Sequence, residues 1–280
     1  MISGDLQHHA YRRLLGVLQM VVNVTRAGGF EAGGAAVVTA QKLRLLHAGV
    51  RRIAHGQARL RDYQRTYGVP VNHEDMLATI MGFSLLVIDG FERLDIPLTP
   101  AQAEDYYYIW RVFAQLMGIH PEGDRNGTAY VPATVAEART FYDSYARRHF
   151  VDDPGQNREG VALARANLAM MRDLLPKAWL LRWLTRPAPR IYMQILNGPE
   201  GMRRVGIAPV TGFRLARWLL RRLPRIWALA WSEADRVLDP SAHAHENLSR
   251  LFFQHLITRA YGRPVEFLLP ERLRDLRKLA

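Results

Sequence analysis

Residues 72–118, NHEDMLATIMGFSLLVIDGFERLDIPLTPAQAEDYYYIWRVFAQLMG, carry most of the information on the fold class. Their apolar side chains recur at helical spacing, and the alternation typical of strands is nearly absent. Asn72 belongs to the residue types that cap helices, and Glu74 and Asp75 favour the positive end of a helix. These features predict a helix over residues 74–93. Asn72 and Asp75 are expected to cap this helix rather than to take part in catalysis.

A second helix is expected over residues 100–117 of the same segment. Thr99 is a suitable cap, Pro100 suits the first helical position, and Gly118 is a typical stop. Because the same helical spacing returns along the rest of the chain, we predict an all-α protein. Further helices are expected over residues 6–26, 37–62, 134–150, 157–173, 244–261 and 270–279, with loops over 28–34 and 120–133.

The segment 176–240 differs from the rest because it is rich in Trp and Arg. It is also interrupted by prolines, which break helices, so several short helices are predicted there. The interrupting prolines are Pro187, Pro189, Pro209 and Pro224. We interpret residues 1–280 as a single helical domain to which 176–240 adds a peripheral part.

The composition excludes several classes of site. The chain has 280 residues, 49% of them apolar, and no Cys, which excludes disulfides, thiolate zinc sites and iron–sulfur clusters. A net charge of +12 suits nucleic acid, an anionic membrane or an anionic cofactor without choosing among them. No uncharged apolar run long enough for a membrane span and no signal peptide are recognised, so a cytoplasmic protein is expected.

The segment KLRLLHAGVRR, residues 42–52, places one histidine, His47, among leucines and arginines. On a helix His47 falls on the apolar face, and Arg44 and Arg51 lie three residues before and four after it, at one edge of that face. Long arginine stems can cross an apolar surface and present charge at its rim. The apolar face is predicted to consist of Leu43, Leu46, Val50 and Ala54.

Two interpretations of this helix stay open. His47 can be a core histidine whose ring bonds to a backbone carbonyl, which the helix taken alone favours. Alternatively, it can be an iron ligand on a face suited to a flat apolar cofactor with two carboxylates, which Arg44 and Arg51 would bind.

Four segments together resemble one known family. They are the His-Ala-x-x-Arg pattern at 47–51, the Asn-x-Glu-Asp start at 72–75, and the helices at 83–94 and 108–118. In this order they resemble the oxygenase domain of bacterial latex clearing proteins (rubber oxygenases) and of the fungal oxygenase of mycophenolic acid biosynthesis. The similarity extends from about Tyr11 to Arg263-Pro264. It implies a globin-like helical core around haem b, and cleavage of a carbon–carbon double bond in a hydrophobic, isoprenoid-like substrate by dioxygen.

The resemblance also implies roles for single residues. His47 matches the proximal haem ligand, Arg44 and Arg51 are expected to bind the propionates, and Arg13 matches a distal arginine that would stabilise negative charge on dioxygen. Rubber oxygenases carry Arg-x-x-Lys-Thr in the distal segment, where this chain has Gly16 and Val17 in place of the lysine and threonine. The family's distal glutamate lies upstream of the matching arginine. If the chain naturally begins close to this arginine, the base is either missing or supplied by another residue, for which His8 and His9 are the nearest candidates.

Other patterns allow a functional and a purely structural interpretation. An apolar stripe at helical spacing could line a substrate tunnel, although such stripes are more often core. It consists of Met76, Ile80, Phe83 and Val87. His243, His245 and Glu246 could bind one metal ion only from a loop, and no further ligand is evident.

The segment 214–227 is basic, amphipathic and contains tryptophan, so it could lie on an anionic membrane or pack on the core. No motif for sequence-specific nucleic-acid binding is recognised, and no nucleic-acid partner is expected. The alternative function is that of a catalytically degenerate relative, a helical protein that binds haem or lipid at a membrane surface.

Overall fold

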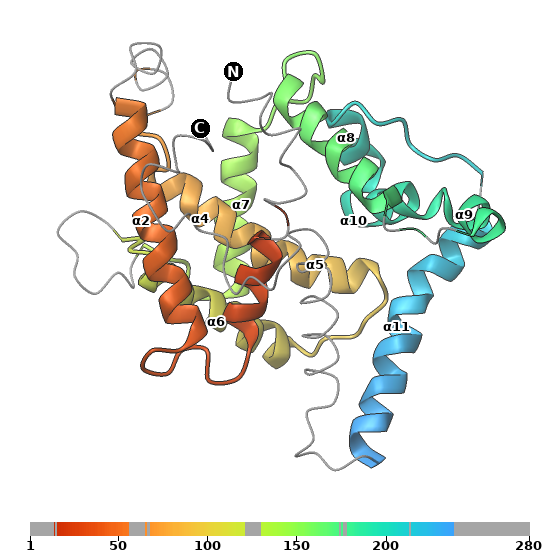
Figure 1. The fold of residues 1–280 in the computed structure, drawn as a ribbon, viewed down its shortest axis with the longest axis horizontal. Coiled ribbons are helices and arrows are strands. Elements are labelled where there is room, and N and C mark those ends of the chain that lie inside the picture. The colour runs from red at the N-terminus through yellow and green to blue at the C-terminus, as the bar shows by residue number, and fades with distance from the viewer. Residues whose placement is uncertain are drawn as a thin grey trace. The chain divides into compact units, whose positions relative to one another are not determined.

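The computed structural model describes residues 16–55, 68–120, 130–173, 178–212 and 214–237, and Leu14, Arg65 and Leu175 singly. Every regular element in these ranges is a helix, and they contain no strand (Figure 1). The all-α prediction is therefore confirmed. The helices predicted over 244–261 and 270–279, and most of the loop at 120–133, lie outside the described residues.

The described chain groups into two compact units. The first, called the α2–α7 unit, comprises residues 16–88 and 99–148; the second, called the α8–α11 unit, comprises residues 89–98 and the described part of 149–237. Each unit is described by itself below, and a single domain over 1–280 stays a prediction.

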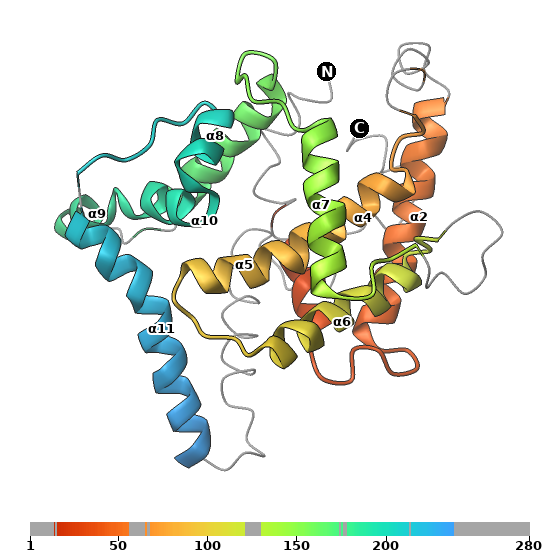
Figure 2. The same ribbon diagram turned by 180° about the vertical axis from the view of Figure 1, so that it is seen from behind.

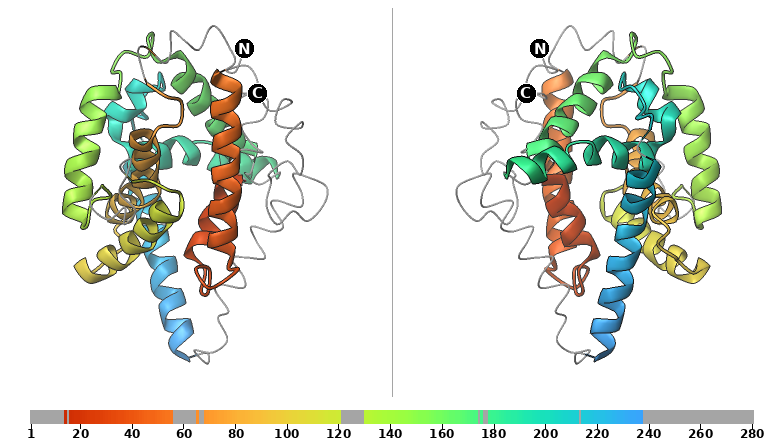
Figure 3. Two further views of the ribbon diagram at one scale, coloured as in Figure 1. Left: turned by 90° about the vertical axis from the view of Figure 1, so that its left-hand side faces the viewer. Right: turned by 90° about the vertical axis from the view of Figure 1, so that its right-hand side faces the viewer.

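The α2–α7 unit is a layered helical assembly. Residues 16–25 are helical, and α2 (Ala35–His55), α4 (His73–Phe83), α6 (Pro100–Leu116) and α7 (Val135–His149) follow. Figure 3 shows α4 and α6 lying between α2 and α7, and both α2 and α4 pack on α6. The helix predicted over 134–150 is confirmed by α7.

Aromatic side chains of α6 form the centre of this unit. Tyr107, Trp110 and Phe113 are buried at three- and six-residue spacing, which puts them on one face of the helix. The Trp110 ring stacks on Phe83 at 5.3 Å between centroids and meets the edge of Phe113 at 5.9 Å. The Tyr106 hydroxyl donates to the carbonyl of Phe83 at 3.0 Å and so joins α6 to the end of α4.

The ends of α4 and α6 are formed by the side chains that the sequence indicates. Asn72 accepts from the backbone N–H of Asp75 at 2.8 Å, a cap that typically contributes about 1 kcal/mol. Thr99 and Gln102 form a reciprocal capping box at the start of α6. Gly118 ends it with φ of 76°, a left-handed conformation that costs glycine little.

The helix predicted over 74–93 is interrupted at Ser84. The chain forms α4 up to Phe83 and then α5 (Leu85–Arg93), and Ser84 between them has φ −107° and ψ −78°. The buried Ser84 hydroxyl donates to the carbonyl of Ile80 at 2.8 Å. Such a bond to the residue four back competes with the regular ladder and bends helices. The residues on both sides of Ser84 are mainly apolar, so the hydrophobic pattern continues through the break and does not indicate it.

The glycine-rich segment before α2 forms a loop, as predicted. Gly33 has φ of 75°, and a Cβ on Gly34 would collide with the carbonyl of Gly29. The amide of Ala36 donates to that same carbonyl at 2.9 Å, so α2 begins two residues earlier than the expected residue 37. Residues 56–62 of the predicted second helix lie outside the described part.

The α8–α11 unit contains α8 (Arg158–Asp173), α9 (Trp179–Thr185), α10 (Ala188–Arg204) and α11 (Arg214–Val237), as seen from behind in Figure 2. Helix α8 confirms the prediction over 157–173, and α10 packs against α8 and α11. The prolines act differently from one another. A kink at Gly198 and Pro199 divides α10, whereas α11 continues through Pro224.

The break expected at Pro224 was therefore wrong. Proline removes one backbone donor and disturbs the carbonyl four residues earlier, which water can satisfy where a helix is exposed. Helix α11 is solvent-exposed on both sides of Pro224. Within the described ranges, none of the helices combines the length and apolar composition that crossing a bilayer requires.

Candidate functional site

His47 lies on the face of α2 that turns toward the core of its unit. The buried positions of this face are Ala36, Ala40 and Ala54, and the half-buried Leu43 packs against the same core. His47 continues this stripe at helical spacing and is half-buried. Val50, predicted to belong to the stripe, is 40% exposed. The inward position one turn after His47 is taken by Arg51, which is also half-buried.

The His47 ring is held in its neutral form. Burial lowers the pKa of His47 below its ordinary value, and the positive charge of Arg51 lowers that pKa further. The Nδ1 atom of His47 is buried and has no hydrogen-bond partner among the described residues. A neutral imidazole is the form that binds metals, and a buried ring nitrogen without a partner is costly. In a metal-bound histidine the second ring nitrogen almost always donates to an acceptor, and Nδ1 of His47 has no such acceptor among the described residues.

Arg51 connects α2 to the start of α4. Its guanidinium donates to the carbonyl of Val71 at 2.6 Å and lies 4.0 Å from the sulfur of Met76. Val71 has φ of 58°, which is a rare conformation for a β-branched residue and costs about 1–3 kcal/mol. The charge-assisted bond from Arg51 fixes the strained peptide that immediately precedes the Asn72 cap.

Arg44 binds the other neighbouring helix. Its guanidinium donates to the carbonyl of Leu116 at 3.1 Å, at the end of α6. It also covers Gly118, where an added Cβ would lie 3.4 Å from the guanidinium carbon. Each arginine keeps further N–H groups beyond the bonds described here, so binding of propionates by Arg44 and Arg51 stays a prediction.

The distal part of the predicted site is only partly described. Arg13, His8 and His9 lie outside the described residues, so their roles stay predictions. Gly16 and Val17 lie on the helix 16–25, and a Cβ added to Gly16 meets no atom within 4 Å. The buried Nδ2 of Asn23 on this helix donates to the hydroxyl of Thr39 at 2.9 Å, which joins the helix to α2.

The apolar stripe of α4 behaves as core. Met76 and Ile80 are buried members of the main apolar cluster, and the half-buried Phe83 packs against it. Val87, the last residue of this stripe, is half-buried on α5. These contacts favour the core interpretation over a tunnel.

No cluster of three or more potential metal-ligating side chains occurs in the part of the chain that the structure describes. The candidates His243, His245 and Glu246 lie outside it.

A polar network at the start of α4 includes two residues that sequence reasoning missed. The hydroxyl of Tyr145 on α7 donates to the carboxylate of Asp75 at 3.1 Å, and Arg148 forms an ion pair with Glu74. Burial, followed by the negative charge of Asp75, raises the pKa of Tyr145 to about 12. The i, i+3 spacing of the two α7 residues indicates only that they share one face of the helix. Their partners lie some 70 residues away in sequence, so this spacing does not reveal the network.

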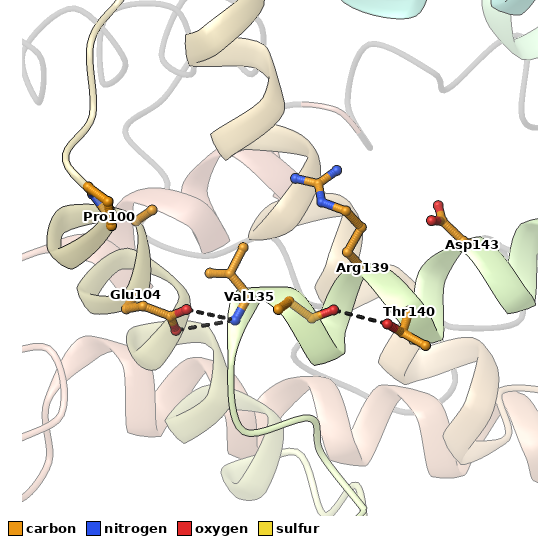
Figure 4. A pocket seen from close by; sticks show the side chains of 8 residues that line it. Pro100, Glu104, Val135, Arg139, Thr140 and Asp143 are labelled. Atoms are coloured by element: carbon orange, nitrogen blue, oxygen red, sulfur yellow. Dashed lines mark hydrogen bonds between the residues drawn. The ribbon is translucent and has the colours of Figure 1, made fainter.

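A surface hollow of about 480 Å³ lies at the starts of α6 and α7 (Figure 4). Its lining includes Glu104, Arg139 and Asp143. No residue of α2 lines it, and the Glu104 carboxylate already accepts from the amide of Val135 at 3.0 Å. This hollow is therefore separate from the face that carries His47.

Comparison with known proteins identifies the family. Residues 2–229 match the family described as ER-bound oxygenase mpaB/B'/Rubber oxygenase, catalytic domain, and the chain belongs to that family. A rubber oxygenase from Streptomyces sp. (strain K30) is 26% identical over 177 residues, which are 62% of this chain and 39% of that protein. No solved structure matches the chain. The matched region includes the whole of α2 and α4.

The lowered pKa of His47 predicts a pH-dependent stability of the chain without cofactor. The unfolded state binds a proton at the ordinary pKa of about 6.5, whereas the folded state resists protonation to lower pH. The free energy of unfolding should therefore fall as the pH falls below about 6.5. Urea titrations between about pH 7.5 and 5 should show a smaller fall for His47→Gln than for the wild type.

His73→Gln controls for the loss of an imidazole from another helix of the same unit. Equal pH slopes for the wild type and His47→Gln would contradict the lowered pKa of His47.

Proposed function

We propose that this chain is a haem b-dependent oxygenase that uses dioxygen to cleave a carbon–carbon double bond in a hydrophobic, isoprenoid-like substrate. His47 is the proximal ligand, and the core around α2 is globin-like. The observation that carries the proposal is the position of His47 on the core-facing side of α2, where burial and the charge of Arg51 lower the pKa of its ring. His47 lies on a helix within the matched catalytic domain.

The surroundings of His47 fit this role. Desolvation and Arg51 keep the ring neutral, which is the state that donates an electron pair to iron. Leu43 supplies an apolar neighbour one turn away on the same face, and Arg44 and Arg51 bring two cations to the same helix. Apolar contact and cations for carboxylates are the two requirements of a porphyrin with propionates.

Bound haem supplies the iron that activates dioxygen. The residues of this chain supply the electrostatics. The guanidinium of Arg51 is bonded to the carbonyl of Val71 and is thereby held at one turn from His47, so its charge acts on the ring from a fixed position. We propose that Arg13, which lies outside the described residues, would stabilise negative charge in the reaction with dioxygen as a preorganised hydrogen-bond donor.

Two measurements on the full chain test this function. Protein expressed with haem supplementation should show a Soret band. It should also consume dioxygen when polyisoprene or smaller terpenes are added, and yield products with aldehyde and ketone ends. A folded, colourless protein would refute the haem-dependent function. A coloured protein that consumes no dioxygen with any of these alkenes would instead support the degenerate, haem-binding alternative.

A further inference from the structure

Helix α11 exposes a continuous apolar stripe. Leu215 is 70% exposed, Trp218 51% and Ile226 60%. Their spacing of three and eight residues, filled by further apolar residues, places the stripe on one side of the helix. It consists of Leu215, Trp218, Leu219, Leu223 and Ile226, each at least 46% exposed. The half-buried side is a different one, formed by Ala216, Leu220 and Pro224.

Arginines lie along the edge of this stripe. Arg214, Arg221 and Arg225 follow one another at spacings of seven and four residues, so they share one flank of α11. Arg222 lies within the stripe, and its guanidinium is 4.7 Å from the centre of the Trp218 ring. Two further contacts are internal, because Arg221 pairs with Asp95 at 2.9 Å and Arg217 donates to the carbonyl of Val210 at 3.1 Å.

The remaining cations are available for an external partner. Among the described residues, Arg214, Arg222 and Arg225 have no carboxylate partner, and all three are exposed. Solvated apolar side chains of this size, rimmed by cations, are the pattern of a helix that lies in a membrane interface. Tryptophan suits that position because its ring is apolar and its N–H is polar.

We infer that α11 docks the protein on an anionic lipid surface. The apolar stripe enters the boundary between headgroups and acyl chains, and Arg214, Arg222 and Arg225 bind lipid phosphates. Figure 2 shows α11 extending away from α8 and α10 within its unit. The exposed fractions of its apolar side chains show that the stripe is accessible. The inference goes beyond the proposed oxygenase function and needs no haem. An enzyme of this family that docks in this way would act at the lipid surface, where apolar substrates dissolve.

Flotation with phospholipid vesicles tests the inference on the full chain. Binding is expected with vesicles that contain phosphatidylserine and should be much weaker with phosphatidylcholine alone. Arg222→Gln/Arg225→Gln should weaken binding about 30-fold, since each basic residue near an anionic surface contributes roughly a factor of five. Trp218→Ser/Leu219→Ser keeps every arginine and should weaken binding by roughly tenfold or more.

Matched variants control for charge and for the oxygenase site. Arg158→Gln/Arg165→Gln removes the same charge from exposed positions of α8 and should bind as the wild type does. His47→Ala should also bind normally, so a failed haem assay and a failed vesicle assay are distinguishable.

Three results would overturn the inference. The first is vesicle binding that survives Trp218→Ser/Leu219→Ser, which shows simple attraction of a basic protein. The second is the absence of binding to phosphatidylserine vesicles. The third is a dimer in sedimentation velocity that the same double substitution dissociates, because the stripe then belongs to a second copy of the chain.

Discussion

His47→Ala is expected to abolish the Soret band of the haem-supplemented protein, because the methyl group cannot donate to iron. Dioxygen consumption with polyisoprene should be lost at the same time. His47 is half-buried and forms no hydrogen bond within the described residues that its removal could break. The variant should therefore fold, and its circular dichroism should match that of the wild type. Absorption spectra of both proteins, prepared side by side, give the result directly.

Two controls make the His47 result specific. His73→Ala removes a half-buried histidine from α4, whose ring lies 5.9 Å from that of His120. It should leave the Soret band in place. Added imidazole should restore a Soret band to His47→Ala by entering the space left by the ring. A Soret band that persists in His47→Ala without imidazole would assign the ligand to another residue and leave His47 as a core histidine.

Trp110→Ala is expected to lower the free energy of unfolding by about 3–5 kcal/mol. Trp110 is 0% exposed and contacts the rings of Phe83 and Phe113. Its removal leaves a cavity in α6, the helix on which both α2 and α4 pack. Urea unfolding of the protein without haem measures this loss separately from any effect on cofactor binding.

Tyr108→Ala is the matched control for Trp110→Ala. Tyr108 is an aromatic residue on the same helix, two positions away, and 59% exposed. Its substitution should change the free energy of unfolding by no more than about 0.5 kcal/mol. A loss below about 1 kcal/mol for Trp110→Ala would show that the described packing of α6 is incorrect.

Local signals account for the parts of the fold that sequence predicts well. The caps Asn72 and Thr99 and the stop Gly118 act through hydrogen bonds or backbone preferences within a few residues. Such effects depend on neighbours in sequence, so residue types reveal them. The position of His47 on the core-facing side of α2 was predictable for the same reason, from spacing alone.

Long-range contacts explain what the sequence did not show. The break at Ser84 depends on a hydroxyl bonded to Ile80 inside an apolar run, which periodicity cannot distinguish from a continuous helix. Arg51 faces inward because its guanidinium donates a hydrogen bond to the carbonyl of Val71, 20 residues away. Sequence patterns assign a charged residue to the surface unless its partner is known. The sequence therefore predicted Val50, rather than Arg51, on the inward face of α2, although Val50 is exposed.

The bond between Arg51 and Val71 makes two properties of the protein inseparable. The same guanidinium lowers the proton affinity of His47 and holds the strained peptide at the entrance to α4. A substitution that removes this charge to make the ring more basic also releases that peptide and the helix that follows it. Natural variation can therefore adjust the proton affinity of His47 through position 51 only together with a change in the neighbouring helix.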